Sequence, residues 1–205
     1  MPHLAKPRTL LATVVILGVL NVLGAVNPAA VTAGNERDER PNILWITAED
    51  MSPTLGCYGD QFATSPHLDR FARESVLYRG AFATAPVCSP SRSCLITGCL
   101  ATTLGTHPMR SAFPLPERIR GFPALLREAG YYTTNNVKTD YNTSSEAALV
   151  ADCWDESSET AHWRNRKPNQ PFFAVFNLMT THQSRSMAWP YPQFQEQVQG
   201  ELPKV

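Results

Sequence analysis

The sequence of 205 residues predicts an α/β fold with a mainly parallel sheet flanked by helices. Two apolar runs, residues 41–47 and 171–178, are typical of strands buried on both faces of a parallel sheet. Between them, a helical segment over residues 122–129 leads into a β-branched and aromatic run over residues 131–137. Strands that alternate with helices favour a parallel sheet over an antiparallel one.

The first 33 residues have the pattern of a signal peptide. Lys6 and Arg8 precede a short apolar core over residues 10–20, and small residues at 31–33 fit a cleavage site. We therefore expect an exported protein, periplasmic or secreted, whose folded part is residues 34–205 and which keeps no stable membrane span after cleavage. An uncleaved membrane anchor is the alternative, although polar and helix-breaking residues interrupt the stretch.

Three further segments complete the predicted order of elements. Ser65 and Pro66 begin a helix over residues 65–74, as cap and first helical residue, and its apolar stripe is Leu68, Phe71 and Ala72. Residues 76–82 are predicted to be a strand or an extended segment. The connection after the third strand is long and polar, with one short helix over residues 145–150.

The segment Cys88-Ser89-Pro90-Ser91-Arg92 is predicted to be a loop that turns into a helix. Ser89 would cap this helix, Pro90 would be its first residue and Gly98 would end it. Cys88 would then lie at a helix N-terminus, which favours anions, with the guanidinium of Arg92 one turn away. The alternative is a buried or disulfide-bonded cysteine beside a surface arginine.

Polar side chains follow each predicted strand. Glu49 and Asp50 end the first strand, Lys138 ends a later one, and His182 follows the last. Because ligands of parallel sheets bind beyond the carboxyl ends of the strands, these residues and the Cys88 loop predict a site at one edge.

Composition excludes some classes of function. A net charge of zero with 18% charged residues gives no indication of nucleic-acid binding. The five cysteines are an odd number, so at least one is unpaired, and their spacing does not match the ligand pairs of zinc sites. They are Cys57, Cys88, Cys94, Cys99 and Cys153.

At these residues the chain resembles the N-terminal part of the sulfatase family. Cys88-Ser89-Pro90-Ser91-Arg92 matches the sulfatase signature, and residues 95–98 continue it. Residues 41–50 resemble the family's first strand with its acidic pair, and residues 64–69 resemble the start of its first helix. Among sulfatases, the set is most similar to the heparan N-sulfatase (sulfamidase) type.

The resemblance implies an alkaline-phosphatase-like fold and hydrolysis of sulfuric esters or N-sulfates, with sulfated polysaccharides as the substrates. Cys88 would be converted by a formylglycine-generating enzyme to formylglycine, whose hydrate attacks sulfur. One divalent ion, Ca²⁺ in most of the family, would be held by Glu49, Asp50 and the modified Cys88. Arg92, Lys138 and His182 would be the other catalytic residues, contacting the modified residue, the sulfate or the leaving group.

Three further residues are weaker candidates. His107 and Arg110 would meet an anionic sugar or else belong to a solvated loop, and Asp140 stands where the family often has histidine. Since family members are usually more than twice as long, we expect a domain incomplete at its C-terminus that lacks further metal ligands. A phosphate or phosphonate ester hydrolase of the same superfamily and a non-catalytic secreted fragment are the alternative functions.

Overall fold

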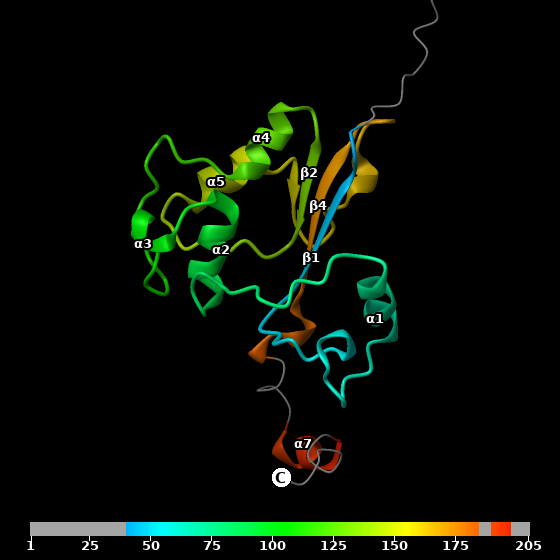
Figure 1. Ribbon diagram of the computed structural model, residues 1–205. Helices are drawn as coiled ribbons and strands as arrows, with labels where there is room; N and C mark the ends of the chain where they lie inside the picture. The colour runs from blue at the N-terminus through cyan, green and yellow to red at the C-terminus, as the bar shows by residue number, and fades with distance from the viewer. Residues whose placement is uncertain (1–39, 185–189, 198–205) are drawn as a thin grey trace, which may run out of the picture. The chain divides into compact units, whose positions relative to one another are not determined.

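A four-stranded parallel sheet organises the chain (Figure 1). The computed structural model describes residues 40–184 and 190–197, so the predicted signal peptide over residues 1–33 lies outside the described residues. The strand order is β1-β4-β2-β3, and every pairing is parallel. The strands are β1 (Ile43–Ala48), β2 (Tyr132–Asn136), β3 (Glu156–Ser157) and β4 (Phe172–Leu178). The predicted α/β class is confirmed.

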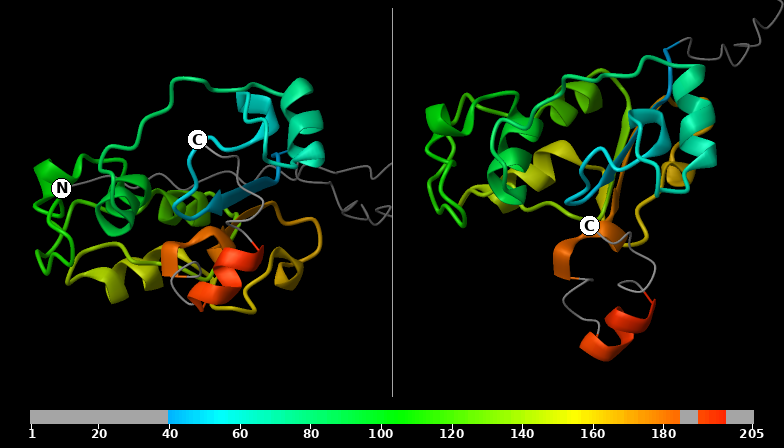
Figure 2. Two further views of the ribbon diagram at one scale, coloured as in Figure 1. Left: turned by 90° about the horizontal axis from the view of Figure 1, so that it is seen from below. Right: turned by 60° about the horizontal axis from the view of Figure 1, so that its bottom comes forward.

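Helices α2, α4 and α5 lie together on one side of the sheet in Figures 1 and 2. The helices predicted over residues 65–74, 122–129 and 145–150 are present as α1, α4 and α5, whereas α3, α7, β3 and the 3₁₀ helices were not predicted. The α-helices are α1 (Pro66–Arg73), α2 (Cys88–Thr97), α3 (Ala101–Leu104), α4 (Phe122–Glu128), α5 (Glu146–Cys153) and α7 (Tyr191–Gln197). The 3₁₀ helices are η1 (Gly56–Tyr58), η2 (Trp163–Asn165) and η3 (Met179–Thr181).

The prediction for the start of helix α2 is wrong by two residues. The helix begins at Cys88, with Val87 in the cap position, so Ser89 is not the cap and Pro90 is the third helical residue. Ser89 is fully buried, and its hydroxyl turns inward to the sulfur of Met109 at 3.0 Å. Pro90 is tolerated because the first four N–H groups of a helix have no acceptor within it. Gly98 ends the helix as predicted, with φ +68°.

Strand β1 is not buried on both faces, contrary to the prediction. Leu44 and Ile46 are 51% and 57% exposed, whereas Trp45 packs toward the helices. The reason is that β1 is an edge strand and that α2, α4 and α5 cover only its other face.

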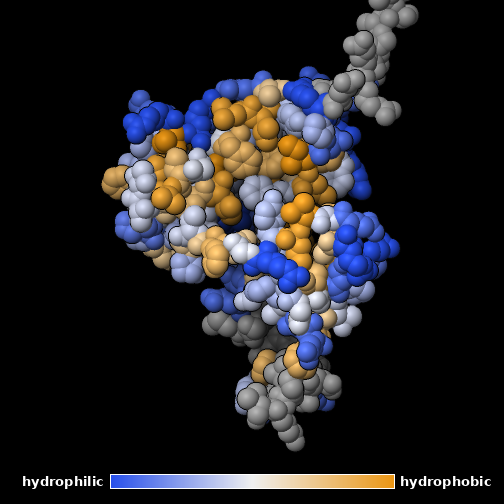
Figure 3. All heavy atoms as spheres, viewed as in Figure 1, coloured by the Kyte–Doolittle hydropathy of each residue, from blue (hydrophilic) through white to orange (hydrophobic). Residues whose placement is uncertain are grey.

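Residues 76–82 contain no strand and run as an extended connection to α2. Figure 3 shows apolar side chains gathered on the face in view.

An aromatic cluster joins the sheet to α4 and α5. Phe173 of β4 contacts Phe122 of α4 at 5.3 Å between ring centroids, and Trp154 stacks on Phe173 at 5.8 Å. Trp45 closes the cluster against Phe122 at 5.9 Å. On the opposite face of β4, Trp163 of η2 packs on neighbouring aromatic rings. Trp154 and Trp163, both in the polar connection, therefore fix that connection on both faces of the sheet.

All five cysteines lie within the described ranges, and all five are free thiols. Burial raises the pKa of the Cys153 thiol to about 11, so this cysteine is a neutral part of the core. Among the described helices none is long and apolar enough to cross a membrane.

An ion-pair group holds α4 and α5 together at the surface. Arg120, just before α4, donates two hydrogen bonds of 2.8 Å to the carboxylate of Asp152 in α5. It also pairs with Glu128 of α4 at 2.6 Å. The hydrogen bonds from Arg120 hold the pKa of Asp152 below its ordinary value, against a smaller opposing effect of burial.

We expect Asp152→Asn to lower the free energy of unfolding by less than about 1 kcal/mol, since the pair is half-exposed. A lowered folded-state pKa stabilises the fold above about pH 4, the ordinary pKa of aspartate, and this contribution is lost as the pH falls further. Urea unfolding from pH 3 to pH 7 measures the difference, with Glu159→Gln as an exposed control. A difference from wild type that is constant across this range would contradict the prediction.

Candidate functional site

A buried carboxylate with two cations lies at the carboxyl edge of the sheet. Glu49, directly after β1, is 7% exposed and accepts a hydrogen bond from Arg92 Nη1 at 3.2 Å. Its other oxygen accepts one from Lys138 Nζ at 2.7 Å. Three residues that the sequence analysis placed at separate strand and helix ends are thus in direct contact, and together they carry one net positive charge.

The backbone around η3 holds the acidic pair in place. The Glu49 N–H donates to the carbonyl of Leu178 at 3.2 Å, and the Thr181 hydroxyl donates to the Glu49 carbonyl at 2.5 Å. Asp50 has φ +52°, in the left-handed region that few non-glycine residues adopt. Asp50 Oδ2 accepts the N–H of Gln183 at 2.9 Å and lies 3.9 Å from His182 Nε2.

Arg92 ties helix α2 to the end of β2. Its Nε donates to the Thr139 carbonyl at 2.7 Å, and its Nη2 donates to the Lys138 carbonyl at 2.5 Å. With the bond to Glu49, each side-chain nitrogen of this buried guanidinium has an acceptor. These hydrogen bonds offset the free energy that is needed to bury the charge of Arg92.

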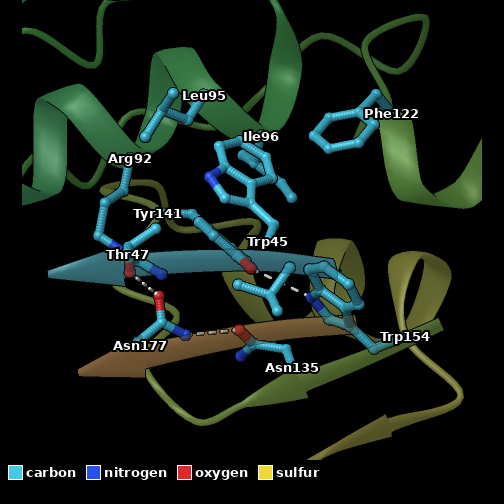
Figure 4. A pocket seen from close by; sticks show the side chains of 11 residues that line it. Trp45, Thr47, Arg92, Leu95, Ile96, Phe122, Asn135, Tyr141, Trp154 and Asn177 are labelled. Atoms are coloured by element: carbon cyan, nitrogen blue, oxygen red, sulfur yellow. Dashed lines mark hydrogen bonds between the residues drawn. The ribbon is translucent and has the colours of Figure 1, made fainter. Parts of the chain in front are cut away.

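Beneath Arg92, a chain of amides crosses three strands (Figure 4). The Thr47 hydroxyl donates to Asn177 Oδ1 at 3.0 Å, and Asn177 Nδ2 donates to Asn135 Oδ1 at 2.9 Å. Asn135 Nδ2 donates in turn to the Lys138 carbonyl at 3.2 Å. The amide chain therefore orients the same carbonyl that Arg92 binds.

A small cavity of about 30 Å³ lies beside this amide chain (Figure 4). Tyr141 and Trp154 line it, and the Trp154 indole N–H donates to the Tyr141 hydroxyl at 3.1 Å. Burial raises the pKa of Tyr141, so the hydroxyl stays protonated. Most of the lining is apolar, and we assign the cavity to core packing under the site.

Cys88, the first residue of α2, lines a hollow of about 510 Å³ together with Glu49, Asp50, Ser91 and Arg92. A helix N-terminus presents N–H groups without helical acceptors, and Arg92 adds charge to it. A second hollow of about 440 Å³ shares Asp50 with the first and contains His182. The region suits an anion whose centre lies near Cys88.

Asp50 and Glu49 differ in their ability to bind a metal ion. Asp50 Oδ1 makes no hydrogen bond to a described residue, whereas both Glu49 oxygens are bound to cations. Across residues 40–184 and 190–197, no three His, Cys, Asp or Glu side chains cluster closely enough to hold a metal ion. Because Ca²⁺ takes six to eight oxygens, the described residues fit part of a calcium site, not a whole one.

Of the three weaker candidates, Asp140 and Arg110 contact the site and His107 does not. Asp140 Oδ2 lies 4.0 Å from Lys138 Nζ, and Asp140 Oδ1 accepts a bond from Arg110 Nη1 at 3.2 Å. His107 is exposed and has no hydrogen bond or ion pair with any residue the structure describes. Arg110 and Asp140 thus extend the site, and His107 does not.

Sequence reasoning missed Asn135, Asn177 and Thr47. A signal for the two asparagines was present, because asparagine is disfavoured within strands and both lie in runs predicted to be strands. In the structure both are nearly inaccessible. A buried amide in a strand needs a polar partner, so these residues mark the strands that neighbour the site.

The sulfatase family model matches residues 41–204. The chain belongs to the sulfatase family. Among curated relatives of this sulfatase domain, an ulvan-active sulfatase of Formosa agariphila is 45% identical over 159 residues, which cover 71% of this chain and 26% of the relative. Human iduronate 2-sulfatase is 35% identical over 103 residues, covering 50% of this chain and 19% of that enzyme. The chain thus spans less than a third of the length of these relatives.

Solved structures share the fold. A protein in complex with its substrate D-glucosamine-2-N,6-O-disulfate has a TM-score of 0.61 at 22% identity, covering 81% of this chain and 39% of that one. A 2-O GAG sulfatase has a TM-score of 0.55 at 20% identity, covering 68% and 35% of the two chains. The alkaline-phosphatase-like architecture implied by the sequence resemblance is confirmed.

We expect Glu49→Gln to lower the free energy of unfolding by about 3 kcal/mol, because it leaves Arg92 and Lys138 close together without a counter-charge. The double variant Glu49→Gln/Lys138→Met should recover part of this loss. Urea unfolding of both variants, beside the exposed control Glu159→Gln, measures the effect. A Glu49→Gln variant as stable as the control would show that the ion pairs of Glu49 with Arg92 and Lys138 do not stabilise the carboxyl edge of the sheet.

Proposed function

We propose that this sulfatase domain hydrolyses sulfuric esters or N-sulfates at Cys88. The observation that carries the proposal is the position of Cys88 as the first residue of α2, in one hollow with Glu49, Asp50 and Arg92. A sulfate group is negatively charged in the substrate and throughout the reaction, so it needs cations and N–H donors around it. The net positive triad and the helix N-terminus supply both.

Each neighbour of Cys88 has a role in this proposal. Cys88 is converted to formylglycine by a formylglycine-generating enzyme and acts as the nucleophile after hydration. Arg92 holds the modified residue, and Lys138 neutralises the sulfate from the side of β2. His182 contacts the sulfate or protonates the leaving group. A divalent ion, Ca²⁺ in our proposal, would be held by Asp50 with Glu49 and the modified Cys88, and would polarise the sulfate.

The substrate class we propose is a sulfated polysaccharide outside the cytoplasm. Relatives of the chain include enzymes named for ulvan and for iduronate, which supports a sulfated sugar. The signal-peptide pattern over residues 1–33 supports export to the periplasm or the medium. That the chain is most similar to the heparan N-sulfatases remains a prediction. Turnover of N-sulfated glucosamine in preference to O-sulfated glucosamine would support it.

Modification of Cys88 tests the proposal most directly. The tryptic peptide from Gly80 to Arg92 contains no other cysteine, so its mass reports an aldehyde or a thiol at position 88. In a host with the modifying enzyme we expect the aldehyde, together with turnover of an aryl sulfate that Cys88→Ala abolishes and Cys57→Ala preserves. An unmodified thiol in that host, or a strong preference for an aryl phosphate, would contradict the proposal.

Calcium binding tests the metal part independently of turnover. We expect CaCl₂ to raise the melting temperature of the chain, because an ion that binds only the folded state stabilises it. Asp50→Asn should remove this rise, and Glu117→Gln, at an exposed site, should leave it unchanged. If calcium leaves the melting temperature of the wild-type chain unchanged, residues 1–205 bind no such ion in the folded state.

A further inference from the structure

Five charged side chains of alternating sign form a ladder that leads out of the site. The charge ladder runs from Arg92 through Glu49, Lys138 and Asp140 to Arg110, with successive N–O distances of 3.2, 2.7, 4.0 and 3.2 Å. Side-chain exposure is 10% at Arg92, 7% at Glu49 and 12% at Lys138, and it rises to 19% at Asp140 and 74% at Arg110. Arg92, Glu49 and Lys138 have roles in the proposed function, whereas Asp140 and Arg110 have none.

Arg110 has donors to spare at the outer end of the charge ladder. Its bond to Asp140 uses Nη1, and among the described residues Nε and Nη2 have no acceptor. A guanidinium has five N–H groups in a planar fork that matches a carboxylate or a sulfate. Arg110 is therefore a cation oriented by one partner and open to a second.

The loop that carries Arg110 is fixed by Asn142. This buried amide donates to the carbonyls of Thr106 and Pro108 at 2.6 and 2.7 Å, and its oxygen accepts the N–H of Ser111 at 2.9 Å. The loop therefore runs beside the segment that carries Asp140. The backbone of Arg110 is held from both sides, so ordering of the loop adds little to the entropy lost when the side chain binds a ligand.

We propose that Arg110 binds a second anionic group of the substrate, a carboxylate or a further sulfate, while the sulfate to be cleaved lies at Cys88. The inference rests on the proposed function and adds a substrate class: sugars with two or more negative groups. Asp140 contributes by holding Arg110 and by neutralising it in the free protein. A sugar with a single sulfate gains nothing from Arg110, so this residue sets specificity.

Binding of defined sugars tests the proposal without turnover. We would measure it by calorimetry in a Cys88→Ala background, alone and combined with Arg110→Gln. The probes are N-acetylglucosamine 6-sulfate, its disaccharide with a uronic acid, and glucosamine N,6-disulfate. We expect Arg110→Gln to weaken binding of one or both doubly charged probes about tenfold, the size of one charge-assisted hydrogen bond, and to leave the singly charged probe unchanged. Which doubly charged probe responds tells whether a carboxylate or a sulfate is bound.

Two further variants separate the role of Arg110 from general charge. Arg118→Gln removes an exposed arginine elsewhere and should change no affinity, and Arg110→Lys should give an intermediate loss because it keeps the charge without the fork. Equal weakening of all three probes by Arg110→Gln, no change in any, or no binding by the parent protein would overturn the proposal. Aryl sulfate turnover without selective weakening would overturn this inference alone, whereas selective weakening without any sulfatase turnover would overturn only the proposed function.

Discussion

The pairing of one buried carboxylate with two cations fixes the carboxyl edge of the sheet. Glu49 lies where β1 ends, and Arg92 and Lys138 reach it from α2 and from the end of β2. Either cation buried without Glu49 would cost free energy, so the helix and both strands must meet at this point. The remaining donors of Arg92 close the arrangement on the Lys138 and Thr139 carbonyls.

The same pairing limits what Glu49 can do. Each of its oxygens already accepts a hydrogen bond from a cation, so ligation of a metal by Glu49 must share or displace one of these bonds. Asp50 Oδ1, in contrast, makes no hydrogen bond to any residue within the described ranges. Glu49 is therefore first a counter-ion that shapes the anion site, and Asp50 is the better placed of the two to meet a metal ion.

The sequence predicted three of the four strands, most α-helices and the meeting of Glu49, Arg92 and Lys138, because parallel strands bring their carboxyl ends to one edge. The prediction failed where the burial or bonding of a residue depends on segments that are distant in the sequence. An apolar run such as Ile43–Ala48 does not show which neighbours cover it, and Leu44 and Ile46 lie on a face that the described helices leave open. The amide chain was missed for the same reason, since Asn177 of β4 and Asn135 of β2 bind each other from different strands.

Charge alternation explains why an aspartate suits position 140, where the resemblance more often implies a histidine. Asp140 lies between Lys138 and Arg110, at 4.0 and 3.2 Å from their nitrogens. A histidine there would be neutral or positive, and would leave the two cations repelling each other across it. A carboxylate attracts both, and it holds Arg110 beside the site. Asp140 and Arg110 therefore act together: in place of a histidine, the chain has an ion pair whose arginine is the proposed second contact for an anion.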